Sequence, residues 1–416
     1  MLNLCRPDSD RYWSLSNLVF VTYITFLAGF YFVPNAVDHY KFYIAAVFFP
    51  GLLLLPTALK QARHSLIWLS LLAYLGYMLL SSLWSDNFST AILWRDVRYT
   101  GYILSFTLVT LYFFERNRLL PTAIMQLVAL VVIVAAAISI ATFEPVTQQP
   151  ASLHQRLVGL GTTDNPNPSA FIYGFFAVIA LDYAHKYWGG KLAYVYAVGF
   201  ATIFLFVILT ESNTGLLALT AACTLLFLVD KRRALPALFI GLVLGLVTAA
   251  YLAWSMGLLN AAIDVGFSKR LPIWQHVVEQ WQAAPVFGHG YQKVIVLAEN
   301  GTPSIVNYAH SVFLSTLRDG GLVGLFLLLL VYGFALRSAL RTALADHNPL
   351  YLCLFVFGLV CVLVDVDQIV TRPRELWVIL WLPLACLMAC ELGLTGEKTP
   401  DTKDADARAD DNHKTD

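Results

Sequence analysis

The chain has 416 residues, of which 58% are hydrophobic and 13% are charged, and its mean hydropathy is +0.66. Soluble globular proteins carry about 25% charged residues, so this composition excludes an ordinary soluble domain and indicates a membrane protein. The 27 basic residues are balanced by 27 acidic ones, and we expect no nucleic-acid partner.

Apolar runs recur along the chain, each near the length of about 20 residues that an α-helix needs to cross a bilayer. We therefore expect an all-α, polytopic integral membrane protein with about twelve transmembrane helices. Their predicted bounds are 17–33, 42–59, 66–83, 99–114, 121–143, 168–185, 191–210, 213–229, 235–254, 320–336, 349–367 and 375–392.

These helices divide the chain into four predicted parts. Residues 1–254 carry nine helices, residues 255–308 form a large loop, and residues 309–392 carry three more helices. Residues 393–416 form a tail whose charged, weakly apolar composition is typical of a disordered segment. The loop is too long for a connector, and we expect it to fold as a small helical cap on the outer side.

The distribution of lysine and arginine predicts the orientation, because these residues stay preferentially in short cytoplasmic loops. One set of alternate loops holds most of them, which places both termini in the cytoplasm and the cap outside. Several arginines lie on the outer side against this bias: Arg95, Arg98, Arg156, Arg270, Arg372 and Arg374. We treat these exceptions as candidates for function.

The cap contains one amphipathic pattern. Trp274, Val277, Val278 and Trp281 follow the i, i+3, i+4, i+7 spacing of a helix with an apolar stripe, which could lie along the membrane surface. A second outer segment, 144–168, ends in a run rich in Asn and Pro that favours turns.

Two motifs resemble those of a known enzyme family. His310-Ser311, followed after nine residues by Gly321-Leu-Val-Gly324, resembles the signature of the bacterial O-antigen ligases, in which a histidine and then Asn, Ser or Gln precede a GxxG-type element. The run from Lys269 to Trp274, with the later Pro285, Gly288, His289 and Gly290, is similar to the large periplasmic loop of that superfamily. The superfamily also contains the O-antigen polymerases and the O-oligosaccharyltransferases.

The resemblance implies a metal-independent, inverting glycosyltransferase that uses no cofactor. Such an enzyme moves an assembled glycan from undecaprenyl pyrophosphate to a sugar hydroxyl of lipid A-core, at the periplasmic face of the bacterial inner membrane. The sequence departs from the family where many members carry Ser-Arg-Gly, because this chain reads Glu211-Ser-Asn-Thr-Gly215. Another arginine must then hold the donor phosphates: Arg156 or Arg270, or else Arg95, Arg98 or Arg372.

The chemistry of this reaction assigns roles to a few residue types. A guanidinium group matches phosphate oxygens with a planar, permanently charged fork, so Arg156 and Arg270 are the candidate ligands of the donor pyrophosphate. An acceptor hydroxyl needs a base, and histidine, with an ordinary pKa of about 6.5, suits that task, which makes His310 the candidate catalytic residue. We expect supporting roles for Ser311, Lys269, Trp274, Arg318, Gly321 and Gly324.

Each assignment has a competing structural interpretation. His310 could be an ordinary interfacial residue, Arg270 could pair with Asp264, and the tryptophans could anchor the cap at the membrane rather than stack on sugars. For the glycines we favour helix packing over substrate contact, and for Arg95, Arg98, Arg372 and Arg374 we favour ion pairs with neighbours such as Asp96 and Glu375. Asp365-Val-Asp367 resembles a short metal-binding motif, but we expect no metal.

Alternatives to the ligase remain open at the level of sequence. They are an O-antigen polymerase, a protein O-oligosaccharyltransferase and, in a different class, a transporter of lipid-linked glycans. A transporter should carry charges through both leaflets, whereas the conspicuous polar residues here gather on one side. The partners expected for a ligase are the lipid-linked donor, the lipid A-core acceptor and membrane lipids, and the oligomeric state is open.

Overall fold

The computed structural model describes residues 10–116, 120–144, 156–229, 270–292, 295–299, 302–306, 309–345, 347–366 and 368–394. The predicted helix at 235–254 lies outside the described residues, as do parts of the predicted cap and nearly all of the predicted tail.

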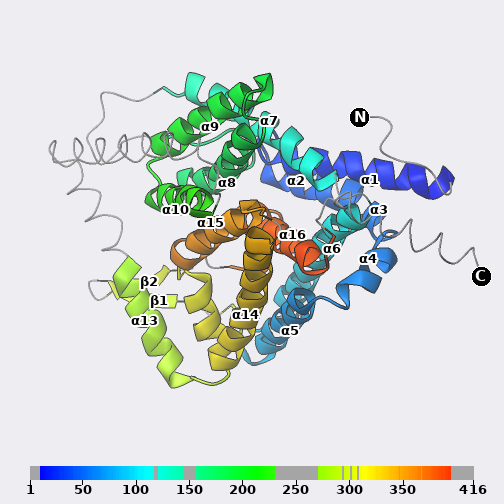
Figure 1. Ribbon diagram of the computed structural model, residues 1–416. Helices are drawn as coiled ribbons and strands as arrows, with labels where there is room; N and C mark the ends of the chain where they lie inside the picture. The colour runs from blue at the N-terminus through cyan, green and yellow to red at the C-terminus, as the bar shows by residue number, and fades with distance from the viewer. Residues whose placement is uncertain are drawn as a thin grey trace, which may run out of the picture.

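Helices dominate the described residues and form one bundle (Figure 1). In chain order the helical elements are α1 (Asp10–Gly29), α2 (Ala36–Phe42), η1 (Tyr43–Phe48), α3 (Phe49–Gly51), α4 (Leu55–Ala62), α5 (Leu66–Ser81), η2 (Ser82–Trp84), α6 (Thr90–Arg116), α7 (Leu120–Ala141), α8 (Pro166–Lys186), α9 (Lys191–Leu209), α10 (Asn213–Val229), α13 (Arg270–Ala283), α14 (Val312–Ala345), α15 (Leu350–Val364), η4 (Trp377–Trp381) and α16 (Leu382–Glu391).

The apolar helices identify a multi-pass membrane protein. Among the described residues, four stretches could cross a membrane by length and composition: Leu66–Trp84, Pro121–Ala141, Lys191–Leu209 and Val312–Ala345. A bent pair, Ala36–Gly51 with Leu55–Ala62, would make a fifth. Shorter apolar helices fall on four further predicted spans: Leu15–Gly29, Asn213–Val229, Leu350–Val364 and Trp377–Glu391. The total of about twelve transmembrane helices stays a prediction from the sequence.

Two local predictions need correction. The predicted span at 42–59 is broken by a 76° bend, and Pro50 and Pro56 lie on either side of the break, where a proline can neither donate a backbone hydrogen bond nor continue a helix interior. The predicted helical cap also contains an antiparallel hairpin of β1 (Ile295–Glu299) and β2 (Thr302–Val306), in which Ile295 lies opposite Val306.

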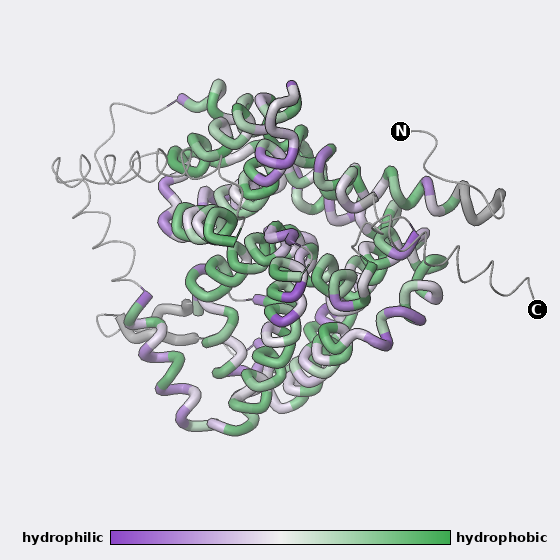
Figure 2. The backbone as a smooth tube through the Cα atoms, in the orientation of Figure 1, coloured by the Kyte–Doolittle hydropathy of each residue, from purple (hydrophilic) through white to green (hydrophobic). Residues whose placement is uncertain are grey.

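The interior of the bundle is built from helices that are apolar around their circumference. Every residue of α8 from Ser169 to His185 is buried, as expected for a helix without a polar face. Trp377 of η4 lies against Phe26, Tyr43 and Phe106, with ring centroids 5.9, 4.8 and 5.0 Å away. In Figure 2 the bundle helices are mostly hydrophobic, whereas α13 alternates between hydrophilic and hydrophobic residues.

Helix α14 is interrupted at Gly321, whose φ of 62° and ψ of −160° are not helical. Residues 285–290, which we call the 285–290 loop, fill this break. Leu322 and Val323 donate backbone hydrogen bonds to the carbonyls of Pro285 and Val286, at 2.9 and 3.1 Å. In return, Gly290 donates to the carbonyl of Asp319 at 2.8 Å. The break therefore separates a short outer segment, 312–320, from the rest of α14.

We expect Gly321→Ala to destabilise the protein. A Cβ at this position would lie 2.3 Å from the carbonyl oxygen of Val286, and the backbone conformation is one that only glycine adopts readily, so we expect a loss of at least about 3 kcal/mol. Gly333→Ala in the same helix is the matched control, because a Cβ there meets nothing within 4 Å. Thermal unfolding of both purified variants in detergent checks this, and equal melting temperatures would contradict it.

Candidate active site

Three helices begin at the candidate site, and each begins with a side-chain cap. The Asn165 side chain accepts a hydrogen bond from the backbone of Asn167 at the start of α8. Ser212 accepts one from Gly215 at 3.2 Å at the start of α10, and Ser311 accepts one from Leu314 at 3.4 Å at the start of α14. Asn and Ser are preferred in this position because their oxygen satisfies an otherwise unpaired N–H group. The predicted supporting role of Ser311 is thus to cap the helix that follows His310.

The residues just before two of these caps have strained backbones. Glu211 and His310 both have a φ of 52°, the left-handed region that a side chain other than glycine disfavours. Such a conformation persists only where the surroundings hold it. His310 holds this conformation two residues before α14 begins.

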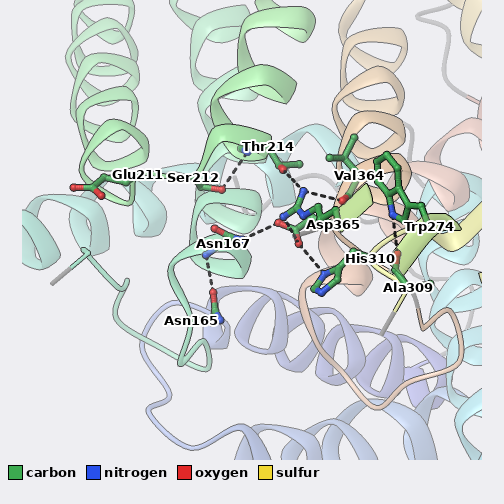
Figure 3. A network of polar contacts seen from close by, with 12 residues as sticks. Asn165, Asn167, Glu211, Ser212, Thr214, Trp274, Ala309, His310, Val364 and Asp365 are labelled. Carbon is green, nitrogen blue, oxygen red and sulfur yellow. Dashed lines mark hydrogen bonds and ion pairs between the residues drawn. The ribbon is translucent and has the colours of Figure 1, made fainter. Parts of the chain in front are cut away.

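The centre of the site is Asp365, the residue that ends α15 (Figure 3). Its Oδ1 lies 3.0 Å from Nη2 of Arg270 and 3.4 Å from Nδ1 of His310. Its Oδ2 accepts a hydrogen bond of 2.8 Å from Nδ2 of Asn167. Only 7% of the Asp365 side chain is exposed, so the carboxylate is buried with its partners around it. We call Asp365, Asn167, Arg156, Arg270 and His310 the Asp365 cluster.

Arg270, the first residue of α13, joins three helices. Besides the carboxylate of Asp365, it donates to the carbonyl of Val364 at 2.9 Å and contacts the hydroxyl of Thr214 at 3.4 Å. A cation is favourable at the C-terminal end of α15 because the last carbonyls of a helix carry partial negative charge. The alternative partner, Asp264, lies outside the described residues.

Arg156 reaches the cluster through Asn167. Its Nη2 donates to Oδ1 of Asn167 at 2.7 Å and to the carbonyl of Glu211 at 3.1 Å, and its Nε donates to the carbonyl of Thr210 at 2.8 Å. Burial lowers the pKa of Arg156 from its ordinary value, and the charges of Glu211 and Asp365 oppose that shift. A guanidinium therefore contacts the backbone at Thr210 and Glu211, directly before the start of α10.

The remaining predicted residues have structural partners. Trp274 donates from its indole to the carbonyl of Ala309 at 3.0 Å. Gly321 forms the break in α14, and a Cβ at Gly324 would lie 3.2 Å from the ring of Tyr77, so both glycines lie in close contact with neighbouring parts of the protein. Arg318 is buried against Asp319, with Nε 2.6 Å from Oδ1. Lys269 lies outside the described residues.

The other outer arginines largely follow the structural interpretation. Arg95 pairs with Asp96 at 2.9 Å and Arg374 pairs with Glu375 at 3.2 Å, as predicted. Arg98 is exposed on α6 and Arg372 is half-buried in the segment after α15.

Of the two residues in the possible metal-binding motif, Asp367 lies outside the described residues. Asp365 contacts Arg270, His310 and Asn167. Within the part of the chain that the structure describes, no group of three or more His, Cys, Asp and Glu side chains could hold a metal ion.

Sequence reasoning missed the two residues that join the cluster together. Asp365 was noticed only as part of a possible metal motif, and Asn167 only as part of a turn. One signal was available for Asp365, because an acidic residue directly after a long buried apolar run needs a cationic partner. Nothing in the sequence names that partner.

These observations define a class: a multi-pass membrane protein with two guanidinium groups and an imidazole gathered at the ends of its helices. A family model described as O-antigen ligase matches residues 198–329, which include Arg270 and His310. A protein from Pseudomonas aeruginosa named O-antigen ligase is 29% identical over 406 residues, which are 93% of this chain and 94% of the relative. The chain is thus similar to an O-antigen ligase over most of its length, and its residues 198–329 match the model of that enzyme family.

Proposed function

We propose that this protein is an O-antigen ligase that transfers a glycan from undecaprenyl pyrophosphate to a sugar hydroxyl of lipid A-core. The observation that carries the proposal is the Asp365 cluster, in which Arg156, Arg270 and His310 meet through one carboxylate and one amide. These three residues come from segments far apart in the chain, and each has the chemistry that one part of the reaction needs.

The two arginines serve the donor. A pyrophosphate carries several negatively charged oxygens, and two guanidinium groups offer charge-assisted hydrogen bonds to them. The starts of α8, α10 and α14 add the partial positive charge of helix N-termini. Neutralising the charge that develops on the departing undecaprenyl pyrophosphate makes it a good leaving group, with no metal required.

His310 serves the acceptor. The contact of Nδ1 with Asp365 favours the tautomer that carries its proton on Nδ1, so Nε2 can take the proton of the attacking hydroxyl. The acceptor oxygen then forms a bond to the anomeric carbon while the bond from that carbon to the phosphate oxygen breaks. A single displacement of this kind inverts the anomeric centre.

The membrane arrangement belongs to the same proposal. About twelve helices would cross the bacterial inner membrane, with both termini in the cytoplasm and the Asp365 cluster at the periplasmic face. Undecaprenyl chains would remain in the bilayer while their pyrophosphate reaches the cluster from the side.

We expect Arg270→Ala and Arg156→Ala to weaken donor binding by at least about tenfold, which corresponds to about 1.4 kcal/mol. Each variant removes one fork-shaped cation from the phosphate site, and Arg270→Lys should recover only part of the loss because lysine lacks the fork. Arg116→Ala is the matched control, since it removes an exposed guanidinium at the end of α6, on the predicted cytoplasmic side. The measurement is the dissociation constant of the undecaprenyl-pyrophosphate glycan, and unchanged affinity in both cluster variants would assign the phosphates to other residues.

One transfer assay tests the function itself. Purified protein receives the lipid-linked glycan together with two competing acceptors, lipid A-core and a second polyprenyl-linked glycan. Product on lipid A-core supports the ligase, and product only on the polyprenyl acceptor makes the protein an O-antigen polymerase. If neither acceptor receives the glycan, the result contradicts both the ligase and the polymerase hypotheses. A protein O-oligosaccharyltransferase and a transporter of lipid-linked glycans are then the remaining alternatives.

A further inference from the structure

Helix α13 runs beside the outer segment of α14, and the two pack through a small apolar cluster. Ile273 and Val277 of α13 lie against Ala309, with Leu314 beside them. Val277, a member of the predicted apolar stripe, therefore contacts protein rather than the membrane surface. Figure 1 shows α13 at the edge of the bundle, next to the start of α14.

Two tryptophans of α13 bond to the backbone at opposite ends of that outer segment. Trp274 donates from Nε1 to the carbonyl of Ala309 at 3.0 Å, before α14 begins. Trp281 donates from Nε1 to the carbonyl of Pro285 at 3.0 Å, and this carbonyl also accepts from Leu322 at the break. The Trp281 bond spans only four residues of its own chain segment, whereas the Trp274 bond ties α13 directly to the backbone next to His310.

The Trp274 bond is made next to His310. Ala309 is fully buried, and the following residue holds the disfavoured φ of 52°. A backbone in this region relaxes unless neighbouring contacts oppose it, and the bond to the Ala309 carbonyl is one of those contacts. In Figure 3 the indole of Trp274 points at this carbonyl, while the imidazole of His310 points toward Asp365.

The same helix also carries a candidate donor ligand. Arg270 begins α13, and Trp274 follows one turn later. A helical turn is stiff, so the distance between the guanidinium of Arg270 and the backbone of His310 is set largely by α13 and the Trp274 bond. A misplacement of about 1 Å between reacting groups can slow a reaction about 100-fold.

We propose that Trp274 is a positioning residue for the base: its indole N–H holds the backbone at His310 and so sets the imidazole relative to the donor phosphates. This inference rests on the proposed function, because it needs His310 to act as the base. It replaces sugar stacking as the role of Trp274 with a hydrogen bond to the main chain.

The loss of this N–H has a specific kinetic signature. Trp274→Phe keeps an aromatic ring against the protein but removes the donor, and we expect kcat to fall about 10- to 100-fold. The KM for the lipid-linked donor should stay within about twofold, because Arg156 and Arg270 keep their contacts. A general loosening of the cap would raise KM and lower kcat together.

The experiment compares four forms of the full-length protein in the transfer assay with lipid A-core, with melting temperatures measured in parallel. They are Trp274→Phe, the protein with the benzothienyl analogue of tryptophan at position 274, Trp281→Phe and His310→Ala. The analogue keeps the shape of the indole and replaces N–H by sulfur, so it tests the bond even if the phenylalanine variant packs poorly. Trp281→Phe is the matched control, because it removes an equivalent bond on the same helix away from His310.

The expected result is a low kcat with unchanged donor KM for both forms altered at position 274, and a kcat within about twofold of wild type for Trp281→Phe. Wild-type kcat in both forms altered at position 274 would overturn the inference. So would parallel losses of kcat and donor affinity in all three tryptophan variants. If His310→Ala still transfers the glycan, His310 is not the base. That result would overturn the proposed function of His310 as well as the positioning role of Trp274.

Discussion

The His310→Ala variant is expected to lose glycan transfer almost completely, with a rate about 10²- to 10⁴-fold below that of wild type. The substitution removes the only imidazole that contacts Asp365 among the described residues, and with it the group that we propose takes the proton of the acceptor hydroxyl. Binding of the donor should remain, because the arginines of the Asp365 cluster are untouched. Transfer rate and donor affinity, measured on the same preparation, check both halves of this expectation.

Two further variants make the interpretation of His310 sharper. His310→Gln retains a polar side chain beside Asp365 but cannot act as a base, so it should be as inactive as His310→Ala. His276→Ala removes another outer histidine, which pairs at 3.5 Å with the exposed Glu279, and should leave transfer unchanged. An active His310→Gln would show that the position needs a hydrogen bond and no proton transfer.

The second large effect is expected at Asp365. Asp365→Ala leaves Arg270, whose side chain is 18% exposed, without its carboxylate partner, and breaking a buried pair in this way costs about 3 kcal/mol. It also frees the imidazole of His310 from the contact that selects its tautomer, so transfer should fall at least about 100-fold. The measurements are the melting temperature and the transfer rate.

A double variant separates the two roles of Asp365. In Asp365→Ala with Arg270→Ala the unpaired buried cation is gone, so much of the lost stability should return. Transfer should not return, because the base remains unoriented and one phosphate ligand is missing. If the double variant recovered both stability and transfer, Asp365 would serve only to neutralise Arg270.

Much of the fold follows from the local sequence. Helix α10 spans the predicted residues 213–229, and α8 extends the predicted 168–185 by a few residues, because long apolar runs end at Asn, Pro or Ser residues that cap or interrupt helices. The break at 52–54 and the hairpin were missed although signals were present. Pro50 and Pro56 flank the break, and Asn300-Gly301 joins the two strands, a dipeptide that strongly favours a hairpin turn.

Single residues of the candidate site could be predicted from the sequence, but the contacts that join them could not. His310, Arg156 and Arg270 were identified from motif, charge and side of the membrane, and the structure brings them together. The residues that join them could not be predicted, because the pairing of Arg270 with Asp365 depends on how α13 and α15 meet in three dimensions. Single-sequence patterns report local periodicity and carry no information about such distant contacts.

The break at Gly321 also has a mechanical consequence for an enzyme that works in a fluctuating bilayer. A membrane-crossing helix tilts or bends as the thickness of the surrounding lipid changes. The carbonyls of Arg318 and Asp319 accept backbone bonds from the 285–290 loop, and Leu322 and Val323, beyond the glycine, donate to the same loop, so this loop bridges the break. The loop follows α13, whose Trp274 bonds to the carbonyl of Ala309, so a tilt of the long part of α14 is passed on to the backbone beside His310.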